Sequence, residues 1–105
     1  MSKTAKGTVV ANQQNTFQAT FTTADGFTRT FSATINPPVP KFRIDDANLT
    51  YNDEDQLTGT DNYYGTIGTD IDIALAKGPT ITGKLVNPMV PTNSIIGGGP
   101  WGMSS

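Results

Sequence analysis

Carboxylates are the only side chains in this sequence that gather densely enough to suggest chemistry. An acidic run, "NDED", spans residues 52–55, and Asp61 follows shortly after it. Carboxylate oxygens on a loop could bind Ca²⁺, which takes about six to eight of them. The spacing does not fit an EF-hand, because counting from Asp53 the position that requires glycine is Thr58. A solvated polar turn is the simpler interpretation, and we expect no metal site.

Catalysis is the function class that the composition disfavours most. The chain has no His and no Cys, so it lacks the commonest general base, the commonest zinc ligand and any thiol or disulfide. Asp70 and Asp72 could form an acid–base pair. However, they alternate with apolar residues and should lie on the outer face of a strand, where a raised pKa is hard to produce. We therefore expect no catalytic residue, no cofactor and no enzyme.

Two adjacent tyrosines suggest a binding surface. Tyr63 and Tyr64 follow Asp61 and Asn62 directly. In an extended strand the two rings point to opposite faces, so one of them is exposed unless a second layer covers it. An exposed tyrosine beside an amide and a carboxylate is typical of a carbohydrate-binding surface. Ordinary cross-strand packing of the rings is the alternative.

Two isolated residues are further candidate contacts. Arg29 is expected on the core side near a hairpin tip, where it could extend past the rim, pair with a carboxylate or contact an anionic ligand at a barrel mouth. Trp101 belongs to a Gly/Pro-rich C-terminal tail at residues 87–105. We expect this ring to be buried on its own sheet or on a second subunit, which would make the tail a contact in a homo-oligomer. A disordered tail is the alternative.

Charge and hydropathy argue against two kinds of partner. The formal net charge is -2 and the Lys and Arg residues are scattered singly, so no basic stripe predicts nucleic-acid binding. No run approaches the ~20 apolar residues of a membrane helix, and no apolar segment of a signal peptide follows the first residues. We expect a soluble chain, either cytoplasmic or secreted after removal of a signal.

Short strands are the elements that would position these residues. Thr, Gly and Pro are frequent and Glu is nearly absent, which favours strands and turns over helices. A short helix that begins at Asp45 is the one helical alternative. The pattern predicts a single all-β domain over residues 1–105, either a compact antiparallel sandwich or a small barrel of about six to eight strands. The candidate strands are residues 6–11, 16–23, 27–35, 41–45, 48–51, 56–60, 63–75 and 79–86.

The registers of two hairpins follow from their turns. In "TTADGFTRT" a two-residue loop would set apolar residues opposite polar ones. A three-residue loop at residues 24–26 instead sets Phe21 opposite Arg29 and keeps the phenylalanines on one face. Gly26 then takes the left-handed position of the turn. The segment "IALAKGPTITG" has the same solution, with Gly78 in that position.

These observations predict a non-catalytic binding or self-assembly module. The first hypothesis is a lectin-like domain that contacts carbohydrate through Asp61, Asn62, Tyr63, Tyr64 and Trp101. The alternative is a small β-barrel that binds an apolar small molecule in its interior, because several glycines could bend and close the sheet.

Overall fold

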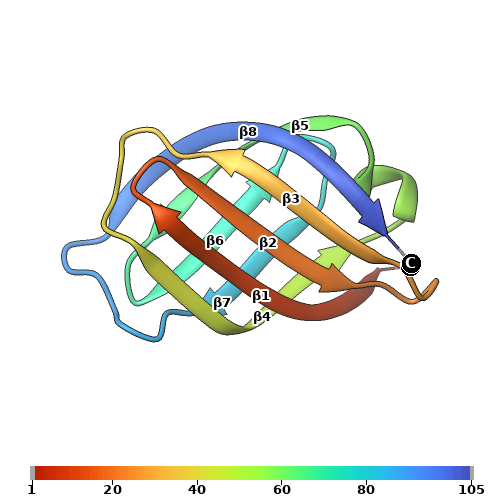
Figure 1. The fold of residues 1–105 in the computed structure, drawn as a ribbon, viewed down its shortest axis with the longest axis horizontal. Helices are drawn as coiled ribbons and strands as arrows, with labels where there is room; N and C mark the ends of the chain where they lie inside the picture. Colours follow the sequence, from red (N-terminus) through yellow and green to blue (C-terminus); the bar gives the residue numbers. More distant parts are fainter. Residues whose placement is uncertain (1, 105) are drawn as a thin grey trace.

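The computed structural model describes residues 2–104, which form a closed antiparallel β-barrel (Figure 1). The all-β prediction is confirmed, and the barrel is formed rather than the sandwich. Around the barrel the strands lie in the order β1-β2-β3-β8-β5-β6-β7-β4, and β4 returns to pair with β1. The elements are β1 (Lys3–Gln13), β2 (Thr16–Thr22), β3 (Thr28–Thr34), β4 (Phe42–Tyr51), the 3-10 helix η1 (Glu54–Leu57), β5 (Thr60–Ile67), β6 (Asp70–Leu75), β7 (Thr80–Lys84) and β8 (Asn93–Ser104).

Both predicted three-residue turns are present. Gly26 and Gly78 have φ angles of 87° and 120°, which lie in the left-handed region that β-branched residues disfavour. Phe21 lies opposite Arg29 in the β2–β3 pair, as predicted. The β6–β7 pair also has the predicted register, with Ile73 opposite Ile81. The alternation of the sequence and one glycine per turn therefore determine these two hairpins.

Two predicted strand boundaries change. The segments 41–45 and 48–51 belong to one continuous strand, β4, and no helix begins at Asp45. A register shift opposite Gly7 to Val9 of β1 marks a bulge in β4, which accounts for the change of side-chain parity in this segment. The predicted strand at 63–75 is the β5–β6 hairpin, interrupted by the turn between its strands.

The acidic segment caps a helix rather than leading into a strand at residues 56–60. The Asp53 carboxylate accepts a hydrogen bond from the backbone N–H of Asp55 at 3.1 Å. The Gln56 carboxamide oxygen accepts one from the backbone N–H of Asp53 at 3.3 Å. This reciprocal pair is a capping box, which stabilises the first turn of η1. The result is a short helix that carries the buried Leu57.

The C-terminal segment is a strand from residue 93 onward and not a tail. β8 lies between β3 and β5 and closes the barrel, as the blue ribbon in Figure 1 shows. Trp101 is buried, and its ring centroid lies 4.9 Å from that of Phe31. The prediction that this ring is buried against protein is confirmed, and the surface that covers it belongs to its own barrel.

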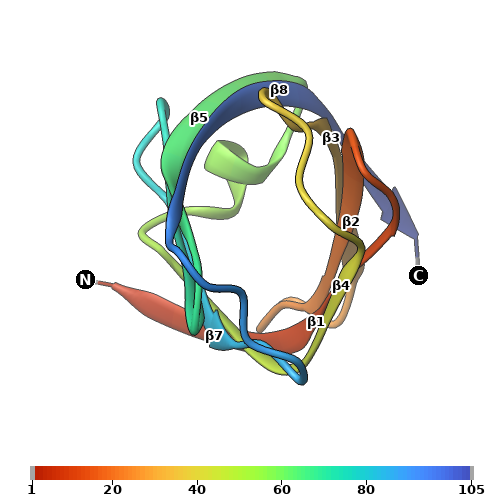
Figure 2. The ribbon, with the colours of Figure 1, turned by 90° about the vertical axis from the view of Figure 1, so that its left-hand side faces the viewer.

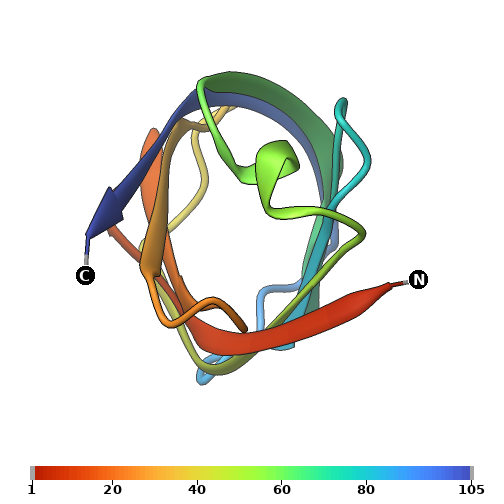
Figure 3. The same ribbon diagram turned by 90° about the vertical axis from the view of Figure 1, so that its right-hand side faces the viewer.

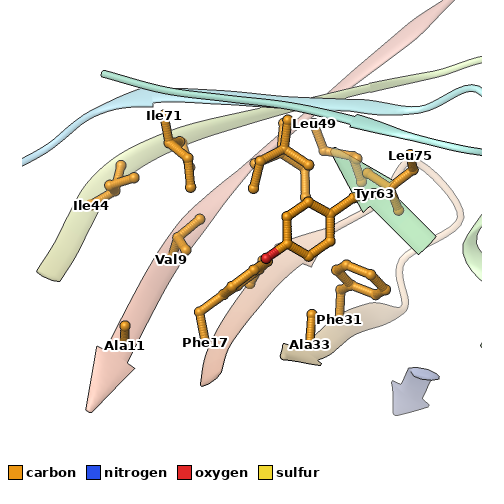
Figure 4. Packing of buried hydrophobic residues seen from close by; sticks show 14 of the residues in the cluster. Val9, Ala11, Phe17, Phe31, Ala33, Ile44, Leu49, Tyr63, Ile71 and Leu75 are labelled. Atoms are coloured by element: carbon orange, nitrogen blue, oxygen red, sulfur yellow. The ribbon is translucent and has the colours of Figure 1, made fainter. Parts of the chain in front are cut away.

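Apolar side chains from all eight strands fill the barrel interior. Figure 4 shows Val9, Phe17, Phe31 and Tyr63 meeting in this cluster. At one end η1 lies within the outline of the barrel and adds Leu57 to the core (Figure 3). At the opposite end, viewed in Figure 2, the chain that follows β3 contributes Ile35 and Val39. A filled interior leaves the outer surface as the place to look for a binding site.

Candidate functional site

The barrel divides the predicted site residues into buried and exposed ones. Asp61, Trp101 and Arg29 are buried. Tyr63 and Tyr64 point to opposite faces, as predicted, and are 4% and 67% exposed. Asn62 is also exposed. Two of the six candidates, Asn62 and Tyr64, therefore face the outside of the barrel, and the other four have structural environments.

Arg29 forms an ion pair at the tip of the β2–β3 hairpin. Its Nη2 atom donates to Oδ2 of Asp25 at 2.7 Å, and its Nε atom donates to the Thr23 hydroxyl at 3.2 Å. The Thr23 hydroxyl and, next, the Arg29 guanidinium lower the pKa of Asp25 to about 2. Of the three roles predicted for Arg29, pairing with a carboxylate is the one observed. The guanidinium holds the turn and is not presented to a ligand at a barrel mouth.

Asp61 and Tyr63 use their polar atoms to join strands. The Asp61 carboxylate accepts hydrogen bonds from the backbone N–H groups of Asn62 at 2.8 Å and Lys77 at 3.2 Å, which ties β5 to the β6–β7 turn. The Tyr63 hydroxyl donates to the backbone carbonyl of Thr34 at 2.7 Å. Burial raises the pKa of this phenol above its ordinary value. These residues and the packed Trp101 are buried and present little surface to a ligand on the outer face.

An apolar row crosses the outer face of three neighbouring strands. Tyr64 of β5 lies opposite Ala74 of β6 on one side and opposite Ile96 of β8 on the other. Side chains at directly opposite positions share a face and have Cβ atoms about 4.5–5.5 Å apart. Ile96 is 56% exposed. We call these three residues the apolar row, and they present more apolar surface than an isolated exposed side chain would.

Two carboxamides flank the apolar row. Asn62 precedes Tyr64 by two residues and shares its face of β5. Asn36 exchanges backbone hydrogen bonds with Ile96, at 2.8 and 2.9 Å, so its side chain lies beside that of Ile96. Within residues 2–104 neither carboxamide has a hydrogen-bond partner. Both groups can therefore donate to and accept from a ligand.

Gly98 provides the space in which the Asn62 side chain lies. These two residues are directly opposite each other in the β5–β8 pair. A Cβ atom at Gly98 would collide with Oδ1 of Asn62 and with the backbone carbonyl of Asp61. The Thr34 hydroxyl bonds the same glycine from the other side, donating to its carbonyl at 3.2 Å and accepting from its N–H at 3.3 Å. The absence of a side chain thus positions the amide beside the apolar row.

Two hollows lie on either side of the apolar row. We call the first the tyrosine hollow, of about 390 Å³, and the second the glycine hollow, of about 560 Å³. Ile96 contributes to both. The residues that line the tyrosine hollow are Tyr64, Gly65, Thr66, Asp72, Ala74, Ser94, Ile95 and Ile96. The residues that line the glycine hollow are Thr34, Asn36, Thr60, Asn62, Ile96 and residues 97–99.

The charge around the two hollows is low. Asp72 is the one charged residue in either lining, and no Lys or Arg takes part. No group of three or more metal-ligating side chains occurs within the described chain. In the acidic segment, Glu54 is paired with Lys3 at 2.9 Å, and the hydrogen bond from Lys3 lowers the pKa of Glu54. The side chains that line the two hollows are therefore mostly uncharged and combine apolar groups with hydrogen-bonding ones.

The fold and this face define a closed antiparallel barrel with a filled interior and an apolar row on its outer surface. In comparisons with known proteins, no family model, no curated protein and no solved structure matches the chain. Residues 2–104 contain no helix with the length and apolar character needed to cross a membrane.

Sequence patterns predicted Asn62 and Tyr64 but not the other three residues of this face, Ala74, Asn36 and Ile96. Asn36 is followed by two prolines and stands outside the candidate strands. Ile96 was assigned to a tail because three glycines follow it. The signal that was available is the pair Ile95-Ile96 itself: in a strand two adjacent isoleucines point to opposite faces, so one of them must be exposed.

Proposed function

We propose that the protein is a non-catalytic binding module that recognises carbohydrate through the apolar row and its two flanking amides. The observation that carries this proposal is the exposed ring of Tyr64, 67% accessible and fixed in the middle of a paired strand. Ordering this ring on binding costs little side-chain entropy, since a tyrosine side chain has only two χ angles.

Sugars match the chemistry of this face. One side of a pyranose ring carries C–H groups that stack on an aromatic ring, and its edge carries hydroxyls that both donate and accept hydrogen bonds. Tyr64 and Ile96 supply the apolar surface, while Asn62 and Asn36 supply carboxamides with both donor and acceptor atoms. The hollows next to the row have volumes in the range of small-molecule sites, about 300–1,000 Å³.

The packed interior weighs against the alternative of an apolar ligand held inside the barrel. The inward-facing side chains of all eight strands occupy that space. A ligand there would have to displace packed residues such as Phe31 and Tyr63, whose ring centroids lie 6.4 Å apart. Displacing well-packed core residues costs several kcal/mol. We therefore favour the outer face.

A glycan array with matched variants tests the proposal. Tyr64→Ala should lose about tenfold in affinity for the glycans that the parent binds, the loss expected when about 1.4 kcal/mol of stacking is removed. Tyr64→Phe keeps the ring and should retain most of the binding. Met103→Ala removes another exposed apolar side chain, 58% accessible, and should have no effect.

Size-exclusion chromatography of the same proteins distinguishes carbohydrate binding from self-assembly. If the face binds sugar and is not an interface between copies, Tyr64→Ala leaves the elution position of the protein unchanged. A parent that binds no glycan but elutes as a dimer, and becomes a monomer on Tyr64→Ala, would show instead that the apolar row is an interface between copies of this chain.

A further inference from the structure

We infer that the ligand of this face is an uncharged sugar chain of at least two units, which lies across the apolar row and occupies both hollows. This inference rests on the proposed carbohydrate function and specifies the class of glycan. It follows from two observations: the hollows share a wall, and their linings lack any positive charge.

The two hollows succeed each other along the direction of β5 and β8. The Tyr64–Ile96 pair lies between the Thr66–Ser94 pair and the Asn62–Gly98 pair. Strand residues two apart are separated by about 6.5–7 Å, so the groups that line the two hollows stand on opposite sides of one row. A single sugar ring stacked on Tyr64 reaches one side of the row. A second unit is needed to reach the other side.

Each hollow has its own hydrogen-bonding groups. The tyrosine hollow presents the hydroxyls of Thr66 and Ser94. The glycine hollow presents the carboxamides of Asn62 and Asn36, and its floor is low because Gly98, which faces outward, has no side chain. Both hollows can therefore bind hydroxyl groups, whereas the row between them offers apolar surface and, apart from the Tyr64 hydroxyl, no polar side-chain atom. This sequence of polar, apolar and polar surface fits a chain that crosses the row.

Charge selects against acidic sugars in the tyrosine hollow. The Asp72 carboxylate lies opposite Thr66 on β5 and opposite Thr82 on β7, and neither neighbour carries a positive charge. The nearest cation by register is Lys84, which lies opposite Asp70 and diagonal to Asp72, outside the lining of the hollow. A uronic acid in this hollow would place two negative charges close together, and added salt would weaken their repulsion.

Calorimetric titration with chains of increasing length tests the inference. The probes are the monosaccharide, disaccharide and tetrasaccharide of the cello-, malto- and manno-oligosaccharide series, with oligogalacturonides as the acidic counterpart. We expect at least one neutral series to gain tenfold or more in affinity from monosaccharide to disaccharide. Asn36→Ala should remove this gain. Gln18→Ala, an exposed amide on β2 outside both hollows, should leave it unchanged.

The same titrations test whether the Asp72 carboxylate weakens the binding of acidic sugars. Oligogalacturonides should bind at least several-fold more weakly than the neutral chains at low salt, and Asp72→Asn should reduce this difference. Equal affinity for monosaccharide and longer chains would overturn the two-hollow inference while leaving the carbohydrate function intact. Preferred binding of oligogalacturonides would overturn the part that concerns charge. If no probe and no glycan on the array binds, the proposed function itself fails.

Discussion

Replacing Tyr63 with phenylalanine would remove one hydroxyl from the seam where β8 meets β3. The β3–β8 ladder ends at the Phe31–Trp101 pair and resumes at the bridge between Asn36 and Ile96. Between these points the Tyr63 hydroxyl donates to the carbonyl of Thr34 at 2.7 Å. The phenol of β5 thus reaches across the interior and supplies a hydrogen bond that β8 does not make.

The direction of the Thr34 carbonyl explains why this bond matters. The N–H of Ile35 donates to the carbonyl of Asn15, on the β2 side. Backbone groups of successive residues point to alternate sides of a strand, so the carbonyl of Thr34 points toward β8. Without the Tyr63 hydroxyl, the Thr34 carbonyl loses its hydrogen-bond partner in a partly buried position. A net hydrogen bond contributes about 0.5–1.5 kcal/mol, and an unpaired buried acceptor costs about 1–3 kcal/mol.

We therefore expect Tyr63→Phe to lower the free energy of unfolding by about 1–2 kcal/mol. Urea denaturation followed by Trp101 fluorescence measures this difference, since the chain has one Trp. Tyr64→Phe removes the same atom from the neighbouring residue, where the hydroxyl is exposed, and should change stability by less than about 0.5 kcal/mol. Equal midpoints for Tyr63→Phe and the parent, or equal losses in the two variants, would refute the role assigned to the seam.

Three other outcomes follow from the turn and the core. Gly26→Val should destabilise the barrel by at least about 1 kcal/mol, because φ is 87° and no atom near the added Cβ offers compensating contact; an unchanged urea midpoint would contradict the turn assignment. Asp25 has a pKa lowered to about 2, so its contribution to stability is present above about pH 4 and is lost as the pH falls toward 2. The stability difference between the parent and Asp25→Asn should therefore narrow over that range, and a constant difference would rule out this linkage. Trp101 should fluoresce at short wavelength and resist quenching in the native protein, and a red-shifted, readily quenched emission would contradict its packing on Phe31.

Local regularities made much of the fold predictable. Two hairpins could be derived because alternation with a period of two residues and a single left-handed glycine leave one register that buries the apolar residues. The opposite orientations of Tyr63 and Tyr64 follow from the same period. Which of the two rings is buried does not follow, because the inner face of β5 is set by its pairing with β6 and β8, and β8 is 30 or so residues away along the chain.

The glycine-rich sequence of β8 was the main reason why this strand was not predicted, since glycine is typical both of mobile chain and of close backbone packing. In β8 the second reason applies. A Cβ atom at Gly97 would collide with the carbonyl of Thr34, and one at Gly99 would collide with that of Ser32. Gly98, between them, leaves room for Asn62 on the outer face. The residues that allow β8 to close the barrel against β3 therefore alternate with the one that forms the floor of the glycine hollow. The two effects separate by residue: Gly97 and Gly99 share the face of the buried Ile95 and Trp101, so a side chain at either would push the seam apart, whereas a side chain at Gly98 would point outward and displace Asn62.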